Sequence, residues 1–245
     1  MAQQQKDERE PAGRPARAPA VFDRAFLIGT EEVTEVLLVR HAQQDVDFHT
    51  APTGEIADPP LTAHGRQQAR LLGEALSTLK VDAVFTSPLR RARETAGAVA
   101  GQHRLEPEVL DDLREVEIFR DMPQEMRAED FLGSDFLEAV RQRMLNERSW
   151  DVYPLSESSY DFSKRAINAV ETAIARSPGE RIVIVCHGGV INAYVGHIIG
   201  SRYDMFFRPA HASVSTVVAG EGRRVLRVLN ETHHLRTGEG DFLSY

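Results

Sequence analysis

The stretch Val36–Ala42, which reads VLLVRHA, decides the fold of this chain. Its first four residues form a continuous apolar run, which is typical of a strand covered on both faces in a parallel sheet. A cation, Arg40, and an imidazole, His41, follow this run directly. Since ligands of such sheets bind beyond the carboxyl ends of the strands, the stretch predicts a central strand with a binding site at its end.

Helices and strands alternate after this first strand. Residues 62–79 carry leucines at helical spacing, and Thr62 is a suitable N-cap. Residues 81–86 predict a second strand, after which Ser87 is expected as the N-cap and Pro88 as the first residue of a helix.

The second half of the chain continues the alternation. We expect helices over about 123–147 and 160–177, a strand over 181–186 followed by a helix to Ile198, and closing strands over 214–218 and 225–229. Strands that alternate with helices predict a three-layer α/β/α sandwich with a mostly parallel central sheet.

The length of 245 residues corresponds to about 1.6 domains of ~150 residues. Residues 1–22 hold four basic residues, three acidic residues and three prolines with few apolar side chains, and so predict a disordered N-terminal arm. The three acidic residues argue against a transit peptide as the alternative. Residues 23–245 are expected to form one catalytic domain.

The composition disfavours several classes of partner. Lys and Arg total 29 against 37 Asp and Glu, and this net charge of −8 is a poor match to nucleic acid or an acidic membrane. No apolar run approaches the ~20 residues that span a bilayer. The single cysteine, Cys186, can form neither an internal disulfide nor a cysteine-rich metal site. We therefore expect a cytoplasmic protein without a nucleic-acid or membrane partner.

Basic side chains gather at the predicted carboxyl ends of three strands. Arg40 and His41 follow the first strand, Arg90 and Arg91 open the helix after the second, and His187 follows the strand over 181–186. Guanidinium groups, imidazoles and the free N–H groups of a helix start form a cradle for a phosphate dianion. No HExxH motif or acidic cluster accompanies the histidines, so we expect no metal.

Five motifs follow one another along the chain: 36–42 (VLLVRHA), 60–69 (PLTxxGxxQA), 87–96 (SxLxRAxxTA), 113–115 (LxE) and 183–189 (VxVxHGG). In this order they resemble the motifs of the histidine phosphatase superfamily, which has the phosphoglycerate mutase-like fold. The resemblance extends over about residues 35–235, most of the chain.

This resemblance implies a role for each residue of the cluster. His41 would be the nucleophile that becomes phosphohistidine, and Glu115 the proton donor. The phosphoryl oxygens and the substrate would be held by Arg40, Arg91, His187 and Gly188. No cofactor is implied.

The chemistry of these side chains fits the same roles. An imidazole with an ordinary pKa of ~6.5 offers an unprotonated nitrogen near neutral pH. Two arginines and a protonated His187 can hold a phosphoryl group without magnesium, and a carboxylic acid can protonate the leaving oxygen.

The identity of the acid stays open at this point. Glu117 lies two residues beyond Glu115 and would face the same side of an extended segment. Glu157 stands in a stretch, 155–158, that resembles a degenerate Gly-Glu-Ser motif of the family. Either carboxylate is an alternative to Glu115.

Two departures from the family's pattern bear on the substrate. Asp47 occupies a position where many members have an Asn that contacts phosphate, so this contact is lost or the loop follows another path. The stretch 116–155 is expected to form a lid-like insertion over the pocket and to set substrate choice.

We therefore predict a metal-independent hydrolase of small-molecule phosphomonoesters, with the substrate itself and assembly as a homodimer left open. A cofactor-dependent phosphoglycerate mutase and a catalytically idle binding or scaffold member are the alternatives. An idle member is expected to have lost a core residue, whereas Arg40, His41, Arg91 and His187 are all present. A cysteine phosphatase is excluded because the arginine that its loop requires would fall at Asn192.

Overall fold

A six-stranded sheet forms the centre of the structure, a computed structural model that describes residues 21–47, 50–238 and 240–245. The strand order is β3-β2-β4-β1-β5-β6. Five of these six strands run in the same direction and β5 runs opposite to them, so the predicted mostly parallel sheet is confirmed. The strands are β1 (Thr34–Arg40), β2 (Ala83–Thr86), β3 (Glu108–Val109), β4 (Arg181–Cys186), β5 (Val214–Gly220) and β6 (Arg223–Glu231).

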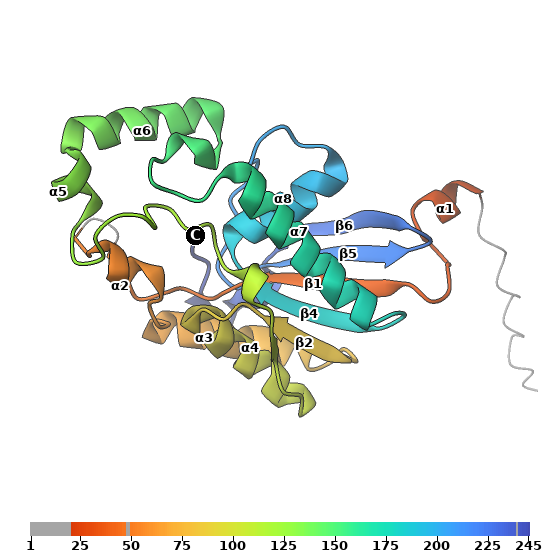
Figure 1. Ribbon diagram of the computed structural model, residues 1–245. Coiled ribbons are helices and arrows are strands. Elements are labelled where there is room, and N and C mark those ends of the chain that lie inside the picture. The colour runs from red at the N-terminus through yellow and green to blue at the C-terminus, as the bar shows by residue number, and fades with distance from the viewer. Residues whose placement is uncertain (1–20, 48–49, 239) are drawn as a thin grey trace, which may run out of the picture.

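Helices cover both faces of this sheet. Val36 and Leu38 of β1 pack in one apolar cluster with α7 (Ser159–Arg176) and α8 (Gly188–Ile199). Leu37 and Val39 pack in another with α3 (Ala63–Leu76) and α4 (Arg90–His103). Figure 1 shows the two pairs of helices on opposite sides of the strands. Because successive side chains of a strand point to opposite faces, a strand buried twice needs the continuous apolar run of β1, and the predicted α/β/α sandwich is confirmed.

The helix after β2 begins later than the sequence predicts. We expected Ser87 as its N-cap and Pro88 as its first residue, but α4 begins at Arg90. The N–H of Arg90 donates instead to the Asp58 carboxylate at 2.6 Å, a cap supplied by a distant loop. The Ser87 hydroxyl lies 2.8 Å from Nε2 of His187. By contrast Thr62 caps α3 as predicted, since its hydroxyl accepts from the N–H of Gly65 at 2.8 Å.

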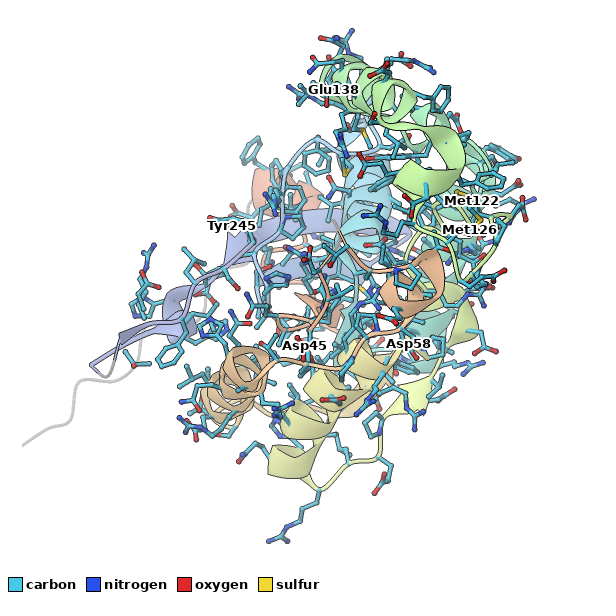
Figure 2. The ribbon with its side chains drawn as sticks, turned by 90° about the vertical axis from the view of Figure 1, so that its left-hand side faces the viewer. Asp45, Asp58, Met122, Met126, Glu138 and Tyr245 are labelled. Carbon is cyan, nitrogen blue, oxygen red and sulfur yellow. The ribbon has the colours of Figure 1, made fainter. Side chains whose placement is uncertain are left out.

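The single helix predicted over 123–147 is wrong, because the structure has two helices there. α5 (Ala128–Leu132) and α6 (Ser134–Glu147) meet at Gly133. The φ of Gly133 is 87°, and because a right-handed helix requires a negative φ, the helix is interrupted there. With η2 (Trp150–Val152) they make up much of the predicted insertion. Figure 2 looks onto the carboxyl edge of the parallel strands and shows Glu138 of α6 standing away from the loops that carry Asp45 and Asp58.

Shorter elements complete the described chain. The predicted arm, 1–22, lies outside the described residues except for its last two, which begin a short helix.

No helix in the described part of the chain is both long and apolar enough to cross a membrane. The shorter elements are α1 (Val21–Ala25), α2 (Thr53–Ala57), η1 (Asp111–Leu113), η3 (His233–Leu235), β7 (Arg236–Thr237) and β8 (Gly240–Asp241).

The contact between α3 and α4 leaves no room for a side chain at Gly73. A Cβ atom there would lie 2.5 Å from the carbonyl oxygen of Ala98, whereas a Cβ at Gly97, on the exposed face of α4, would meet nothing within 4 Å. We expect Gly73→Ala to lower the free energy of unfolding by about 1–3 kcal/mol through overpacking. Gly97→Ala, the matched control, should raise it by roughly 0.5–1 kcal/mol. Urea unfolding followed by circular dichroism measures both, and equal stability of the two variants would contradict this packing.

Candidate active site

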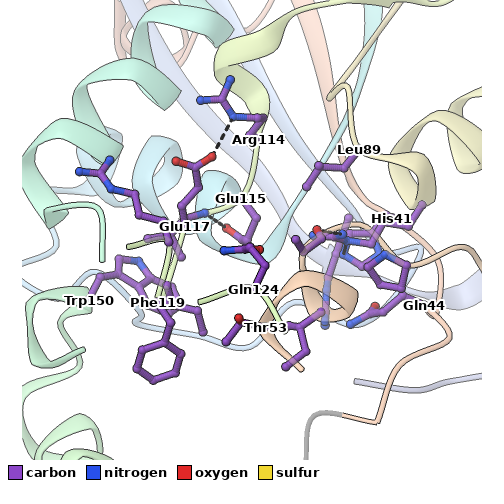
Figure 3. A pocket seen from close by; sticks show the side chains of 18 residues that line it. His41, Gln44, Thr53, Leu89, Arg114, Glu115, Glu117, Phe119, Gln124 and Trp150 are labelled. Carbon is purple, nitrogen blue, oxygen red and sulfur yellow. Dashed lines mark hydrogen bonds and ion pairs between the residues drawn. The ribbon is translucent and has the colours of Figure 1, made fainter. Parts of the chain in front are cut away.

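The carboxyl ends of β1, β2 and β4 bring the predicted site residues to one place. Arg40, His41, Arg91 and Glu115 all line a cavity of about 450 Å³. His187 lies directly behind, with its ring centroid 5.0 Å from that of His41. Figure 3 shows Glu115 and His41 on opposite sides of this cavity. The remaining wall comes from the α2 region and from residues 116–124 and Trp150 of the insertion.

The hydrogen bonds of His41 fix which ring nitrogen carries its proton. Nδ1 lies 2.8 Å from the carbonyl oxygen of Ala42, which can only accept, so Nδ1 carries the hydrogen. Nε2 is therefore the nitrogen with the lone pair, and it accepts from Nε of Arg91 at 3.3 Å. Burial, followed by the charge of Arg91, holds the pKa of His41 well below its usual value. His41 is thus neutral, with Nε2 free for attack, across the physiological pH range.

Arg40 and Arg91 bring two charges into a largely dry environment. Each is tied to a backbone carbonyl: Nη1 of Arg40 donates to Pro209 at 2.5 Å, and Nη1 of Arg91 donates to Ala57 at 3.1 Å. Burial lowers the pKa of Arg40 to about 10, so that it remains a cation at neutral pH. Its Nε is buried without a partner. A buried donor without a partner costs about 1–3 kcal/mol, which an oxyanion in the cavity would recover.

His187 differs from the prediction in its charge. We expected a protonated imidazole, but burial and the neighbouring Arg91 and Arg40 hold the pKa of His187 well below its usual value. Nε2 contacts the hydroxyl of Ser87 at 2.8 Å, and Nδ1 is buried without a partner. His187 is therefore neutral while the cavity holds no anion. A phosphate dianion would act in the opposite direction, because an adjacent negative charge favours the protonated ring.

The Glu115 carboxylate rests on the first turn of α8. Its Oε2 accepts from the N–H of Gly189 at 3.1 Å, and its Oε1 accepts from the N–H of Val116 at 3.0 Å. A Cβ atom at position 189 would lie 2.2 Å from Oε1, so this approach requires glycine. At Gly188 a Cβ would lie 3.8 Å from Nε of Arg40 and 4.0 Å from Oε2 of Glu115. A Cβ at Gly188 would therefore be in ordinary van der Waals contact with both groups, and only Gly189 is held to glycine by a close approach.

The two alternative acids have other partners. Glu157 is buried and forms a two-point ion pair with Arg165, at 2.6 and 2.7 Å. Arg165 also donates to the carbonyl oxygens of Arg114 and Glu115, so this pair supports the segment that carries Glu115. Glu117 lines the cavity but pairs with Arg114 at 3.5 Å. Of the three carboxylates, only Glu115 contacts the start of α8 beside Arg40.

The loop after β1 follows a path that turns Asp47 away from the site. Asp47 is exposed, and its carboxylate accepts from the hydroxyl of Thr50 at 2.9 Å. It does not line the cavity, whereas Gln44 does. The repulsion expected between Asp47 and a phosphate therefore does not arise.

The sequence pattern did not point to His211. This residue is buried, its ring centroid lies 5.8 Å from that of His41, and its Nδ1 contacts the hydroxyl of Ser244 at 3.0 Å. His211 precedes β5, and the start of a strand is ordinarily remote from a site at the carboxyl edge. Because β5 is antiparallel to β1, its start reaches that edge, and only the direction of β5 could have revealed this.

Two further observations concern metal and thiol chemistry. Within the described ranges, no group of three or more His, Cys, Asp or Glu side chains is arranged to hold a metal ion. Cys186 is fully buried, and burial raises the pKa of its thiol far above the usual value. This thiol is therefore unsuited to act as a nucleophile. An unprotonated imidazole, two fixed cations and a carboxyl group remain, and this set suits transfer of a phosphoryl group.

Comparison with known proteins gives consistent results. A family model described as histidine phosphatase superfamily (branch 1) matches residues 36–232. An uncharacterized phosphatase, PhoE, of Bacillus subtilis is 28% identical over 204 residues, covering 83% of this chain and 97% of that protein. Phosphoserine phosphatase 1 of Hydrogenobacter thermophilus is 29% identical over 208 residues, which cover 83% of this chain and 95% of that protein. The solved structure of Bacillus stearothermophilus YhfR has a TM-score of 0.68 and is 27% identical in sequence. The match covers 82% of this chain and 98% of that one.

Burial of neutral histidines makes stability depend on pH. Burial lowers the pKa of His211 to about 3. Below pH ~6.5 the unfolded chain binds a proton at this residue and the folded chain does not, so stability falls as the pH falls. Between pH 7 and pH 5 this one residue should remove about 2 kcal/mol. The pH-dependent loss should therefore be about 2 kcal/mol smaller in His211→Gln than in the parent.

Urea unfolding at both pH values measures this difference. Each protein is compared with itself at the second pH, so a constant loss of packing in the variant cancels. An equal pH-dependent loss in the two proteins would contradict a neutral, buried His211.

Proposed function

This chain belongs to the histidine phosphatase superfamily, and on that premise we propose that it hydrolyses small-molecule phosphomonoesters through a phosphohistidine at Nε2 of His41. One observation carries the proposal. Nε2 of His41, which accepts from Nε of Arg91, belongs to a cavity that also presents Arg40, Arg91 and, on the opposite side, Glu115.

The first half of the reaction transfers the phosphoryl group to the protein. Nε2 of His41 attacks phosphorus, a P–N bond forms and the bond to the ester oxygen breaks. Arg40 and Arg91 hold the equatorial oxygens and balance their negative charge. Glu115, in its acid form, gives its proton to the leaving oxygen, so the product is a neutral alcohol.

The second half returns the protein to its starting state. Water attacks the phosphorus of phosphohistidine while the Glu115 carboxylate accepts the water's proton. The P–N bond breaks, inorganic phosphate forms and neutral His41 is restored. Glu115 releases its proton to solvent as phosphate leaves and takes one up again with the next ester. The bound phosphoryl dianion favours the protonated form of His187 and so acts against burial and the two arginine neighbours.

Replacement of the nucleophile should abolish turnover. We expect His41→Ala to lower phosphate release from phosphomonoesters by at least about 10³-fold, since no other side chain in the cavity offers an unprotonated ring nitrogen. The measurement is phosphate release from an ester panel in the presence of a chelator. Trapping of acid-labile, base-stable phosphate on the parent but not on the variant locates the intermediate. Undiminished release by His41→Ala would overturn the proposal.

Replacement of Glu115 should slow hydrolysis most for esters whose alcohol is a poor leaving group. Glu115→Gln should slow hydrolysis of an alkyl phosphate by about 10²–10⁴-fold, because an alkoxide leaves poorly without a proton. It should slow a nitrophenyl phosphate far less. Glu117→Gln is the matched control, since Glu117 lines the same cavity but pairs with Arg114, and it should slow both esters equally and slightly. Equal slowing of both esters by Glu115→Gln would assign the proton transfer elsewhere.

The same ester panel distinguishes the enzyme alternatives. A mutase would isomerise a phosphoglycerate without net release of phosphate, and an idle member would neither release nor isomerise. We expect net release of phosphate, which would contradict both alternatives.

A further inference from the structure

A second cavity adjoins the first on the far side of Glu115. Its volume is about 670 Å³, and it shares Arg40, Glu115 and Trp150 with the first cavity while lacking His41 and Arg91. We propose that it binds the alcohol part of the substrate, and that this part is a bulky, largely apolar group with a second negative charge at its outer end. The inference rests on the proposed function and names the class of its substrate.

The geometry of displacement assigns the alcohol to this side. In phosphoryl transfer the attacking and leaving atoms lie roughly in line, on opposite sides of phosphorus. Glu115 faces His41 across the first cavity, so a leaving oxygen protonated by Glu115 points away from His41. The second cavity is lined by Gly188 and shares Arg40 and Glu115 with the first, so it adjoins the reacting groups at Glu115.

The wall of the second cavity is apolar and firmly held. It contains Met144 and Leu145 of α6, Trp150, and the sequence Met205-Phe206-Phe207. Asn192 of α8 fixes that last stretch: its Oδ1 accepts from the N–H groups of Phe206 and Phe207, at 2.9 and 3.3 Å. Its Nδ2 donates to the carbonyl oxygens of Phe207 and Gly188, at 3.1 and 2.9 Å. Since this wall exists before any ligand binds, an apolar group can enter without ordering it.

The second cavity carries more positive than negative charge. Apart from Glu115, no lining residue is acidic, whereas Arg148 and Arg208 are exposed and form no ion pair with any described residue. Each lies over an aromatic ring instead, with Arg148 5.0 Å from the centroid of Tyr203 and Arg208 5.9 Å from that of Tyr245. In the first cavity, by contrast, Arg114 is paired with Glu117. Two unpaired guanidinium groups next to an apolar wall favour a carboxylate or second phosphate on an apolar body.

Three primary-alcohol esters test this with similar leaving groups: ethyl phosphate, 2-phenylethyl phosphate and 2-(4-carboxyphenyl)ethyl phosphate. Because the carboxylate and the ring lie away from the ester oxygen, differences in kcat/KM report binding of the alcohol. We expect the phenyl ring to raise kcat/KM at least about tenfold over ethyl phosphate through its buried area. The carboxylate should raise it roughly fivefold further, by an amount that falls with added salt.

Variants locate the effect in the second cavity. In Arg208→Met the ratio of kcat/KM between the carboxylated and plain phenyl esters should fall, and in Arg208→Met with Arg148→Met it should fall to about one. In Leu145→Ser the phenyl advantage over ethyl phosphate should shrink about threefold, since Leu145 is an exposed part of the apolar wall. Arg202→Met is the control, because this exposed arginine stacks on Tyr203 but does not line the cavity. It should keep both ratios of the parent.

The outcomes separate this inference from the proposed function. If none of the three esters releases phosphate and the wider panel is also inert, the proposed function fails. If ethyl phosphate is hydrolysed as efficiently as the two larger esters, the proposed function stands and the assignment of the second cavity is overturned. A carboxylate preference that survives Arg208→Met and Arg148→Met together would likewise overturn the assignment of the charge.

Discussion

Two guanidinium groups buried beside one imidazole are the interaction on which the rest of this structure depends. Taking a cation out of water is costly, and the fold compensates Arg40 and Arg91 with backbone carbonyls, with the nearby Glu115 and, at Arg91, with Asp58. Burial, together with the same two charges, lowers the pKa of His41 and of His187, so both rings are neutral. The site therefore has an unprotonated nitrogen and an excess of positive charge at once. A bound dianion supplies the missing charge, which is why the cluster is costly in the free protein and suited to phosphate.

Much of this arrangement could be predicted from sequence because it depends on local pattern. The apolar run of β1 and the residues directly after it fixed the place of His41, and the strand before His187 did the same there. The predictions that were wrong or missing concern residues whose contacts come from distant parts of the chain. Ser87 has the side chain of an N-cap, but its hydroxyl lies against His187, and a carboxylate from another loop, Asp58, caps α4. His211 was missed because only the direction of β5 brings it to the site.

The choice of the acid shows why spacing alone leaves alternatives. Glu115 and Glu117 do share one side of their segment, as the two-residue spacing implies, and both line the first cavity. They differ in what they face across the fold. The N–H of Gly189 meets the carboxylate of Glu115, whereas Glu117 meets Arg114. Glu157 was singled out by its motif and is close to the site, but Arg165 neutralises it and uses the pair to hold the backbone of Glu115. A positioning role and a chemical one thus look alike in sequence.

The groups that face phosphorus and the groups that line the second cavity are carried by different parts of the chain. Arg40, His41 and Arg91 follow strands, and their positions are set by the sheet and its two apolar layers. The second cavity is built by α6 and by the stretch 205–209. Asn192 links that stretch to the first turn of α8, which also receives the carboxylate of Glu115. Under the proposed assignment of the second cavity, a change in α6 would alter which alcohol fits without moving the strand ends. A change at Asn192 would disturb both the wall and the turn of α8 that contacts Glu115.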